Sequence, residues 1–208
     1  MISRIINRIL CLIIKIKYNK LFFFTKLKVR GLSVIDNGTG NLIQIAEHCT
    51  IHNCKFIFKG NNNSIIIEDR VKLNGVTFWV EDDNNRIKID RNCTFESGTQ
   101  LAACEGTSII IGEDCMFSNN IFIRTTDSHS IVDNNGVRIN AAKDIYIGNH
   151  VWVGLQSIIL KGSTIDDNTV VGARSVVSSS SRHESNCIIA GQPVKIVRRD
   201  IDWSRERI

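Results

Sequence analysis

Bulky apolar residues recur every six positions over most of this 208-residue chain. In the first half they fall in sets of three, with one set every 22 residues, and the first set is Ile45, Ile51 and Ile57. The later sets are Ile67, Leu73 and Trp79; Ile89, Phe95 and Leu101; and Ile111, Phe117 and Ile123. A period of six fits neither an α-helix nor a simple β-hairpin, so the pattern predicts a repeat architecture.

A triangular solenoid explains this period. Each side is one short strand plus a corner, three sides complete a coil, and equivalent residues stack inward from coil to coil. From Ile147 to Val177 the period continues without spacers, so each coil there takes 18 residues. The 22-residue coils carry four extra residues at one corner, within the turn-like stretches Gly60–Asn63, Asp82–Asn85 and Cys104–Thr107. We therefore predict an all-β parallel solenoid.

The residues two positions before each bulky residue test this prediction, because they should face a crowded inner corner. Most are small or β-branched, such as Val71, Ser157 and Ser175. Lys55 is an exception, which predicts an irregular first coil.

The cysteines have two explanations. His48, Cys49, His52 and Cys54 have the ligand types of a zinc cluster. However, the repeat places Cys49, Cys93 and Cys115 on one position of successive coils, the position that Val71 also takes. This alternation with valine is typical of small core residues in a reduced compartment, so we expect neither a metal site nor a disulfide framework.

The first 30 residues form a separate segment, with eight of the 26 basic residues and none of the 21 acidic ones. The remainder is slightly acidic, which does not suit a nucleic-acid binder. Isoleucines from Ile2 to Ile16 recur at helical spacing, so we predict a basic amphipathic helix over residues 1–30. Its longest apolar run, Ile9 to Ile14, is too short to span a membrane, and no small-residue cleavage site follows. We expect this helix to pack on the protein or a partner subunit, or to lie on an anionic membrane surface, in a cytoplasmic protein.

The repeat is interrupted between Ile111 and Ile147, which lie 14 residues further apart than one 22-residue coil. The surplus falls within residues 125–143 and predicts a loop that leaves the solenoid, a natural place for a functional site. His129 stands near its start, beside Asp127. Histidine exchanges protons near neutral pH and suits removal of a proton from an attacking alcohol. A lone histidine is more often structural, so its position alone leaves both interpretations open.

Several stretches make a family resemblance specific. The run Ile147–Gly154, followed by Leu160–Ile165 and Val171–Val176, resembles the signature of the hexapeptide-repeat acyltransferases. Ile189–Arg198 is similar to the closing segment of that family, and Asp127–Ile131 to its catalytic-loop motif. Within the family the chain looks most like the enzymes that O-acetylate bacterial capsular polysaccharide or lipopolysaccharide O-antigen.

The resemblance implies a left-handed parallel β-helix, assembled as a homotrimer with acetyl-CoA bound between neighbouring subunits. We expect the acyltransferase domain to occupy residues 31–190, with the loop at 125–143 protruding from it and a closing segment at 191–208. The left-handed winding is an exception to the usual right-handed crossover.

The family's functional residues can be carried over position by position. His129 matches the catalytic base, and Trp152 matches an aromatic beside the acetyl group of acetyl-CoA. The other cofactor positions are Gly154, Leu155 and Ala173 along the pantetheine arm, and Ser178, Ser179, Lys195 and Arg198 around the adenosine phosphates. Leu155 is bulkier than usual, and Ser179 replaces a position that is often basic.

Four further residues have less specific assignments. Asp127 is a candidate to orient the imidazole of His129, as is a loop carbonyl of another subunit. Glu96 lies near the place where relatives hold a polar side chain for the acceptor. We expect His150 and His183 to be turn residues.

The expected reaction is direct transfer. His129 takes the proton from a sugar hydroxyl, which attacks the thioester of acetyl-CoA, and a backbone amide, such as the one after Gly154, stabilises the oxyanion. Two alternatives stay open: N-acetylation of an amino sugar or another small acceptor, and a non-catalytic scaffold docked on a membrane. The sequence identifies neither the acceptor sugar nor its hydroxyl.

Overall fold

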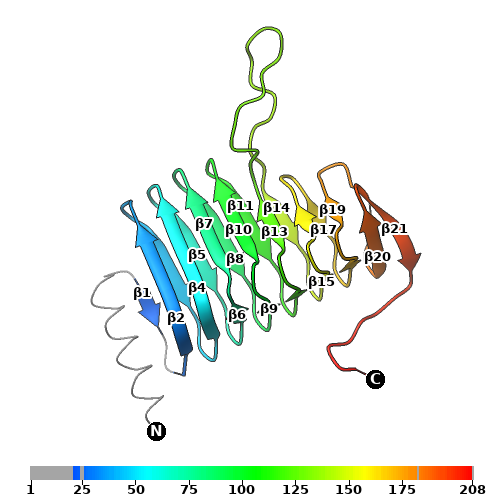
Figure 1. The fold of residues 1–208 in the computed structure, drawn as a ribbon, viewed down its shortest axis with the longest axis horizontal. Helices are drawn as coiled ribbons and strands as arrows, with labels where there is room; N and C mark the ends of the chain where they lie inside the picture. Colours follow the sequence, from blue (N-terminus) through cyan, green and yellow to red (C-terminus); the bar gives the residue numbers. More distant parts are fainter. Residues whose placement is uncertain (1–20, 24–25, 182, 208) are drawn as a thin grey trace.

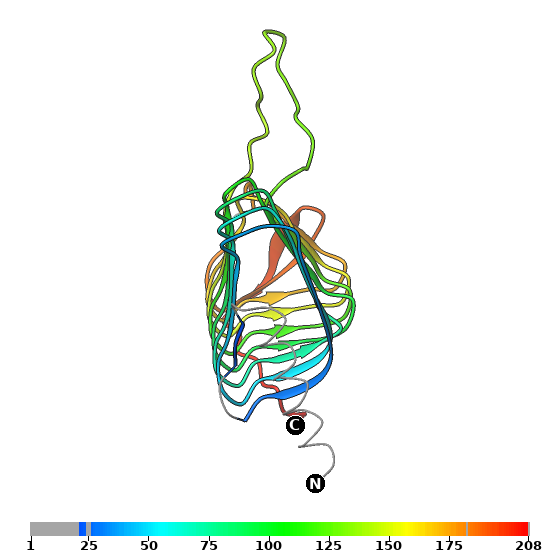
Figure 2. The same cartoon turned by 90° about the vertical axis from the view of Figure 1, so that its left-hand side faces the viewer.

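The structure is a computed structural model that describes residues 21–23, 26–181 and 183–207 (Figure 1). These residues form a parallel β-solenoid of about seven turns, with one long arm leaving it. Viewed at right angles in Figure 2, successive coils superpose and the arm projects from one corner. The described residues include no helix long and apolar enough to cross a membrane.

Three flat faces make up each coil. The first face contains β1 (Leu21–Phe23), β3 (Leu42–Ile45), β5 (Ser64–Ile67), β8 (Arg86–Ile89), β11 (Ser108–Ile111), β14 (Ile145–Ile147) and β17 (Thr164–Ile165). The second face contains β6 (Lys72–Asn74), β9 (Thr94–Phe95), β12 (Met116–Phe117), β15 (Trp152–Val153), β18 (Val170–Val171), β20 (Cys187–Gly191) and the antiparallel β21 (Val194–Arg199). The third face contains β7 (Thr77–Glu81), β10 (Gln100–Cys104), β13 (Phe122–Arg124), β16 (Ile158–Ile159) and β19 (Val176–Val177).

Two strands are long enough to serve both the second and the third face. β4 (Thr50–Lys59) pairs with β6 through its first half and with β7 through its second, and β2 (Lys28–Asp36) pairs along β4. We call the bends after the first, second and third faces the first, second and third corners.

The six-residue rungs are confirmed over most of the solenoid. Bulky residues such as Ile45, Leu73 and Ile111 are fully buried, and the rings of Phe95 and Phe117 stack with centroids 4.2 Å apart. A continuous stack of apolar side chains inside parallel strands is what holds a solenoid together, because each coil buries its neighbours' surface.

The prediction was wrong by one residue on the third face of the first two coils. There Phe56 and Phe78 point inward and stack at 4.6 Å, while Ile57 and Trp79 are only half-buried. The second corner is one residue shorter in these coils than in the next, where Leu101 pairs with Phe78. Because strand side chains alternate, a change of one residue exchanges the inner and outer sets. This also explains Lys55, which lies outside while Cys54 occupies the inner corner.

The solenoid begins earlier than the predicted boundary at residue 31. β1 pairs in parallel with β3, and β2 starts at Lys28, so residues 21–23 and 28–30 are strands rather than parts of a helix. The helical spacing of isoleucines falls in residues 1–20, which lie outside the described residues.

The 22-residue coils, which we call the wide coils, contain a ladder of buried asparagines at the third corner, which sequence analysis did not anticipate. Asn63 donates from its backbone amide and its side chain to Asn41 Oδ1, at 3.0 and 3.1 Å. Asn85 makes the same pair of bonds to Asn63, at 2.8 and 2.9 Å. Each side chain also donates to a backbone carbonyl of the corner, so the buried side-chain amides of the ladder are all paired.

Candidate functional site

The predicted insertion is confirmed as an arm that leaves the third corner (Figures 1 and 2). It occupies residues 125–143 and follows β13, the last strand of the wide coils. The next strand, β14, is the first of the 18-residue coils, which we call the narrow coils. The two sides of the arm meet at an antiparallel bridge between Val132 and Arg138. The Asp133 carboxylate closes the tip by accepting the amides of Asn135 and Val137 at 2.8 and 2.9 Å.

An ion pair fixes the arm to the solenoid. The Arg138 guanidinium donates to both carboxylate oxygens of Glu105, at 2.7 and 2.9 Å, and Thr126 donates to the same carboxylate at 2.6 Å. The hydrogen bonds from Arg138, and then that from Thr126, lower the pKa of Glu105 to about 2. Bidentate geometry makes this a directional contact as well as a charge attraction.

Asn140 ties the two sides of the arm together at its root. Its buried side chain donates to the Asp127 carboxylate at 2.9 Å and to the His129 carbonyl at 2.8 Å. Its Oδ1 accepts the Ile131 amide at 2.7 Å. These bonds fix the backbone on both sides of His129.

Lys161, on the next coil, completes the root. Its ammonium donates to the Asp127 carboxylate and, at 2.7 Å, to the Asn140 carbonyl. The hydrogen bond from Lys161 is the main cause that holds the pKa of Asp127 below its ordinary value, followed by that from Asn140. Asp127 therefore anchors the arm, and its carboxylate bonds to Lys161 and Asn140 rather than to the imidazole of His129.

His129 combines a fixed backbone with an open side chain. The residue is exposed, and its imidazole forms no hydrogen bond with any residue that the structure describes. A base that must accept a proton from an incoming hydroxyl needs an accessible ring nitrogen, and this arrangement provides one.

The aromatic and small residues of the predicted cofactor site gather around the second corner. Trp152 projects from the second face with 36% of its surface exposed, between Met116 and Val170 of the neighbouring strands. Its indole N–H lies 3.5 Å from Ser118 Oγ. At Gly154, a Cβ atom would lie 2.7 Å from the Ala173 nitrogen, so only glycine allows this stacking of corners.

Backbone donors at this corner differ in availability. The Gly154 amide donates to the Val171 carbonyl at 2.8 Å and is already used. The amides of Leu155 and Ala173 donate to none of the described residues, and both residues are exposed. Both amides are therefore free to meet a ligand oxygen.

The predicted phosphate-binding residues lie in two separate places. Lys195 and Arg198 are exposed on β21, beyond the second corner. Ser178 and Ser179 lie at the third corner, where a Cβ on Gly162 would come within 3.0 Å of the Ser179 Cβ. They are therefore closer in the fold to the root of the arm than to the two cations.

Glu96 lies in the same corner column as Gly154, at the second corner of an earlier coil. Its carboxylate accepts a hydrogen bond from Asn74 at 3.2 Å, and Asn74 in turn contacts His52 at 3.0 Å. The structure thus aligns Glu96 with the Trp152 side of the molecule and away from the arm of the same chain.

The predicted site residues form two groups in one chain. His129 and Asp127 belong to the third corner, whereas Trp152 and Gly154 belong to the second, and the whole third face lies between them. Sequence reasoning missed the anchors Lys161, Asn140, Glu105 and Arg138. Lys161 had one usable signal, since it falls at the third corner on the coil that follows the arm.

The cysteines occupy the core as predicted. Cys49, Cys93 and Cys115 are fully buried in one column, and burial raises the pKa of the Cys49 thiol to about 11. Such thiols are poor nucleophiles. Among the described residues there is no group of three or more His, Cys, Asp or Glu side chains placed to hold a metal ion.

Known structures resemble this chain over nearly its whole length. The polysialic acid O-acetyltransferase OatWY matches with a TM-score of 0.78 and 33% identity, covering 89% of this chain and 93% of that one. The polySia-specific acetyltransferase NeuO matches with a TM-score of 0.67 and 33% identity, covering 85% and 90%. No protein-family model matches the chain.

Sequence similarity to another relative extends over a shorter part of the chain. The polysialic acid O-acetyltransferase of Escherichia coli O1:K1 is 37% identical over 86 residues, which span 41% of this chain but only 27% of that protein. The family itself rests on the near full-length structural match at 33% identity, together with the solenoid described above. The chain belongs to the hexapeptide-repeat acetyltransferases, the family of these polysialic acid O-acetyltransferases.

Proposed function

We propose that this protein transfers an acetyl group from acetyl-CoA to a sugar hydroxyl of a bacterial capsular polysaccharide or O-antigen, or of its precursor. The observation that carries the proposal is the near full-length match to a polysialic acid O-acetyltransferase at 33% identity. The exposed imidazole of His129 on an anchored backbone supports it, because direct transfer to an alcohol requires an accessible base.

The chemistry proceeds in one transfer. Nε2 of His129 removes the proton from the sugar hydroxyl as its oxygen attacks the thioester carbonyl carbon. The Leu155 amide donates to the oxygen that becomes negative, which stabilises the tetrahedral intermediate. The carbon–sulfur bond then breaks, and the departing CoA thiolate takes the proton from the His129 imidazolium.

The second corner holds the acetyl-CoA. Trp152 packs beside the acetyl group and the sulfur, and the Ala173 amide donates to the pantetheine arm. Gly154 keeps the two corners close enough for the pantetheine arm of acetyl-CoA to lie against the backbone. Lys195 and Arg198 attract the adenosine phosphates, while Ser178 and Ser179 meet that end of the cofactor from a second chain.

We also propose that the complete site forms between subunits of a homotrimer of left-handed solenoids. His129 and Leu155 stand at different corners of one triangle, so a neighbour related by a threefold axis would bring the arm of one chain to the second corner of the next. The arm also exposes Ile131, Val132, Val137 and Ile139, each with 55–64% of its surface accessible. Apolar side chains gathered in this way favour a covered position in an assembly.

The remaining proposal concerns location. Residues 1–30 hold eight basic residues and no acid. We propose a cytoplasmic enzyme whose basic N-terminal segment packs on the assembly or rests on the anionic inner face of the cell membrane.

A panel assay tests the activity. The purified chain is incubated with acetyl-CoA and a set of acidic and neutral bacterial glycans, while CoA release and product mass are followed. We expect a mass gain of one acetyl group that mild base removes, as esters require. An amide-linked, base-resistant product would instead assign N-acetylation, and no CoA release with any acceptor would favour the non-catalytic scaffold.

A further inference from the structure

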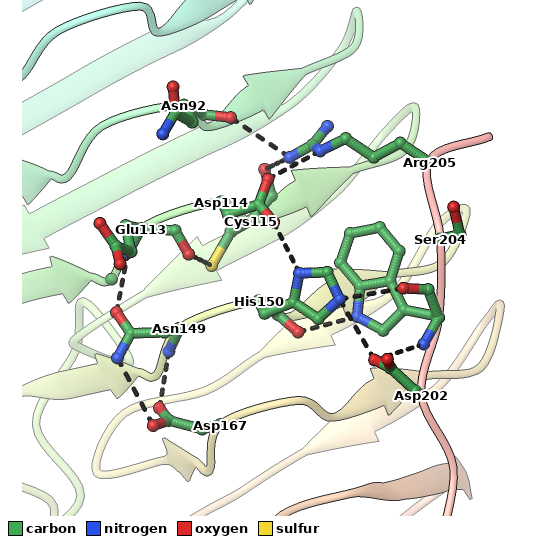
Figure 3. Close-up of polar contacts among 12 residues, drawn as sticks. Asn92, Glu113, Asp114, Cys115, Asn149, His150, Asp167, Asp202, Ser204 and Arg205 are labelled. Carbon is green, nitrogen blue, oxygen red and sulfur yellow. Dashed lines mark hydrogen bonds and ion pairs between the residues drawn. The ribbon is translucent and has the colours of Figure 1, made fainter.

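The residues after β21 form a strap that turns back along the first corner (Figures 1 and 3). We define the strap as residues 200–207. It follows a column of residues that occupy the same position of successive coils and share a left-handed backbone, with φ between 51° and 62°. The members that the strap contacts are Asn92, Asp114, His150, Asn168 and Asn186.

Trp203 is the best-packed residue of the strap. Its ring stacks on the imidazole of His150 with centroids 4.1 Å apart and planes inclined by 13°. Its indole N–H donates to the His150 carbonyl at 2.8 Å, and His150 Nε2 donates to the Trp203 carbonyl at 3.0 Å. Only 9% of its surface is exposed, although it lies on the outside of the solenoid.

Arg205 fastens the strap further along the same corner. Its guanidinium donates to the Asp114 carboxylate at 2.8 Å, to Thr94 Oγ1 at 2.9 Å and to the Cys115 carbonyl at 3.0 Å. Burial acts to raise the pKa of Asp114, but hydrogen bonds from His150 and Arg205 outweigh it and hold this pKa below its ordinary value. On the other side of Trp203, Ile201 bonds with Asn168 and Asn186, so the strap is fixed on both sides of this residue.

The fixed ring of Trp203 lies beside Trp152. The two indole centroids are 6.0 Å apart, with planes inclined by 47°, a tilted arrangement that aromatic pairs favour. On the other side Trp152 reaches Ser118 Oγ through its indole N–H. Trp203 thus lies against the first-corner side of Trp152, and Ser118 and Gly154 lie on its second-corner side.

We propose that Trp203 is a positioning residue, which holds the Trp152 ring toward the second corner where acetyl-CoA binds. The inference rests on the proposed function for the role of Trp152. A half-exposed indole on a flat face has several rotamers, and a wall on one side removes those that turn away from the ligand. The ring is then ordered before the cofactor arrives, so binding does not have to supply that order.

The kinetic test compares Trp203→Ala, Trp203→Phe and Arg205→Ala. We expect Trp203→Ala to raise the KM for acetyl-CoA roughly three- to tenfold, the range that one aromatic contact contributes. The kcat value and the KM for the acceptor should stay within about twofold. Trp203→Phe should keep the KM for acetyl-CoA close to the parent value, and Arg205→Ala should give a KM for acetyl-CoA between those of the parent and Trp203→Ala. The Lys88→Ala variant, which breaks a partly exposed ion pair with Asp90, is the matched control away from the strap.

A spectroscopic test needs no substrate. The chain has three tryptophans, so Trp79→Phe combined with a change at Trp203 leaves Trp152 as the single emitter. With Trp203→Phe we expect acrylamide to quench Trp152 less than with Trp203→Ala. Equal quenching in the two double variants, or an unchanged KM for acetyl-CoA in Trp203→Ala, would overturn the positioning role.

One further variant separates this inference from the proposed function. Trp152→Phe should itself raise the KM for acetyl-CoA. If Trp152→Phe leaves that KM unchanged while quenching still differs between the double variants, the cofactor assignment of Trp152 fails, and with it the catalytic purpose of the positioning. If Trp152→Phe raises the KM and Trp203→Ala does not, the proposed function stands and the positioning role is wrong.

Discussion

The wide and narrow coils apply one repeat in two different ways. The wide coils, residues 42–124, contain two stacked pairs of buried phenylalanine rings and the asparagine ladder at the third corner. The narrow coils, residues 145–177, have strands of two or three residues, inner rungs of isoleucine and valine, and corners closed by Ser and Thr. Their serine hydroxyls bond to backbone groups of the corners: Ser157 donates to the Gly172 carbonyl at 2.9 Å, and Ser175 accepts the Gly191 amide at 3.2 Å.

The wide coils therefore contribute most of the large buried side chains, and the narrow coils contain the residues predicted along the pantetheine arm. In the narrow coils Gly154 lets two corners stack closely beside the backbone amides of Leu155 and Ala173, which donate to none of the described residues. The arm leaves the solenoid at the junction of the two, so His129 is anchored partly by a wide-coil residue, Glu105, and partly by a narrow-coil residue, Lys161.

The largest stability effect should come from an aromatic rung of the wide coils. Phe95→Ala removes a ring that stacks on Phe117 and is expected to cost about 3–5 kcal/mol of unfolding free energy, since a cavity remains. Val177→Ala in the narrow coils removes less buried surface and should cost about 2 kcal/mol. Urea denaturation of both variants checks this order. Equal losses would contradict the division between the two kinds of coil.

The next effect should come from the asparagine ladder. Asn63→Ala leaves the backbone amide and side-chain amide of Asn85 without their acceptor, and we expect a loss of about 2–3 kcal/mol. Ser163→Ala, which removes one bond to the Leu160 carbonyl, should cost about 1 kcal/mol. Thermal unfolding of the pair is the measurement. A ladder variant as stable as the parent would show that the extra corner residues need no such support.

The smallest effect concerns the junction and depends on pH. Glu105 has its pKa lowered from 4.5 to about 2 by Arg138 and Thr126. A carboxylate with a lowered pKa stabilises the folded arm above about pH 4.5, and this contribution is lost as the pH falls toward 2. Because the pair is partly exposed, it contributes at most about 1 kcal/mol. Limited proteolysis of the arm should therefore speed up between pH 5 and 2.5.

Glu105→Gln provides the control for that pH dependence. The variant keeps a polar group of the same size but cannot titrate, so arm cleavage should be faster at pH 5 and should change less on acidification. A parent whose arm is cut at the same rate across this range would contradict the anchoring role of the ion pair.

Much of this architecture could be predicted from sequence because it repeats. The six-residue spacing identified Phe95 and Phe117 correctly, and the break in spacing identified the arm. The prediction failed at Trp79 because Phe78, Trp79 and Val80 are all apolar, so hydrophobicity alone does not tell which residues face inward after a shortened corner.

The anchors and the strap are harder to predict for a different reason. Asn140 and Lys161 meet across 21 residues without any periodic relation, and Trp203 meets His150 across 53. Such contacts depend on how a non-repeating segment turns back in space. The break in the repeat and the family resemblance indicated His129, and the resemblance indicated Trp152. Apart from the corner position of Lys161, no pattern in the chain indicated what holds either of them.

In the proposed mechanism His129 is the base of the transfer reaction. The most direct test of this role is the kcat of His129→Ala with acetyl-CoA and an accepted glycan, beside His48→Ala, another exposed histidine that lies at the first corner of the first coil. We expect His129→Ala to lower kcat by about 10²- to 10⁴-fold with an unchanged unfolding midpoint, while His48→Ala keeps the parent rate. Parent-level turnover in a folded His129→Ala variant would show that His129 is not the base.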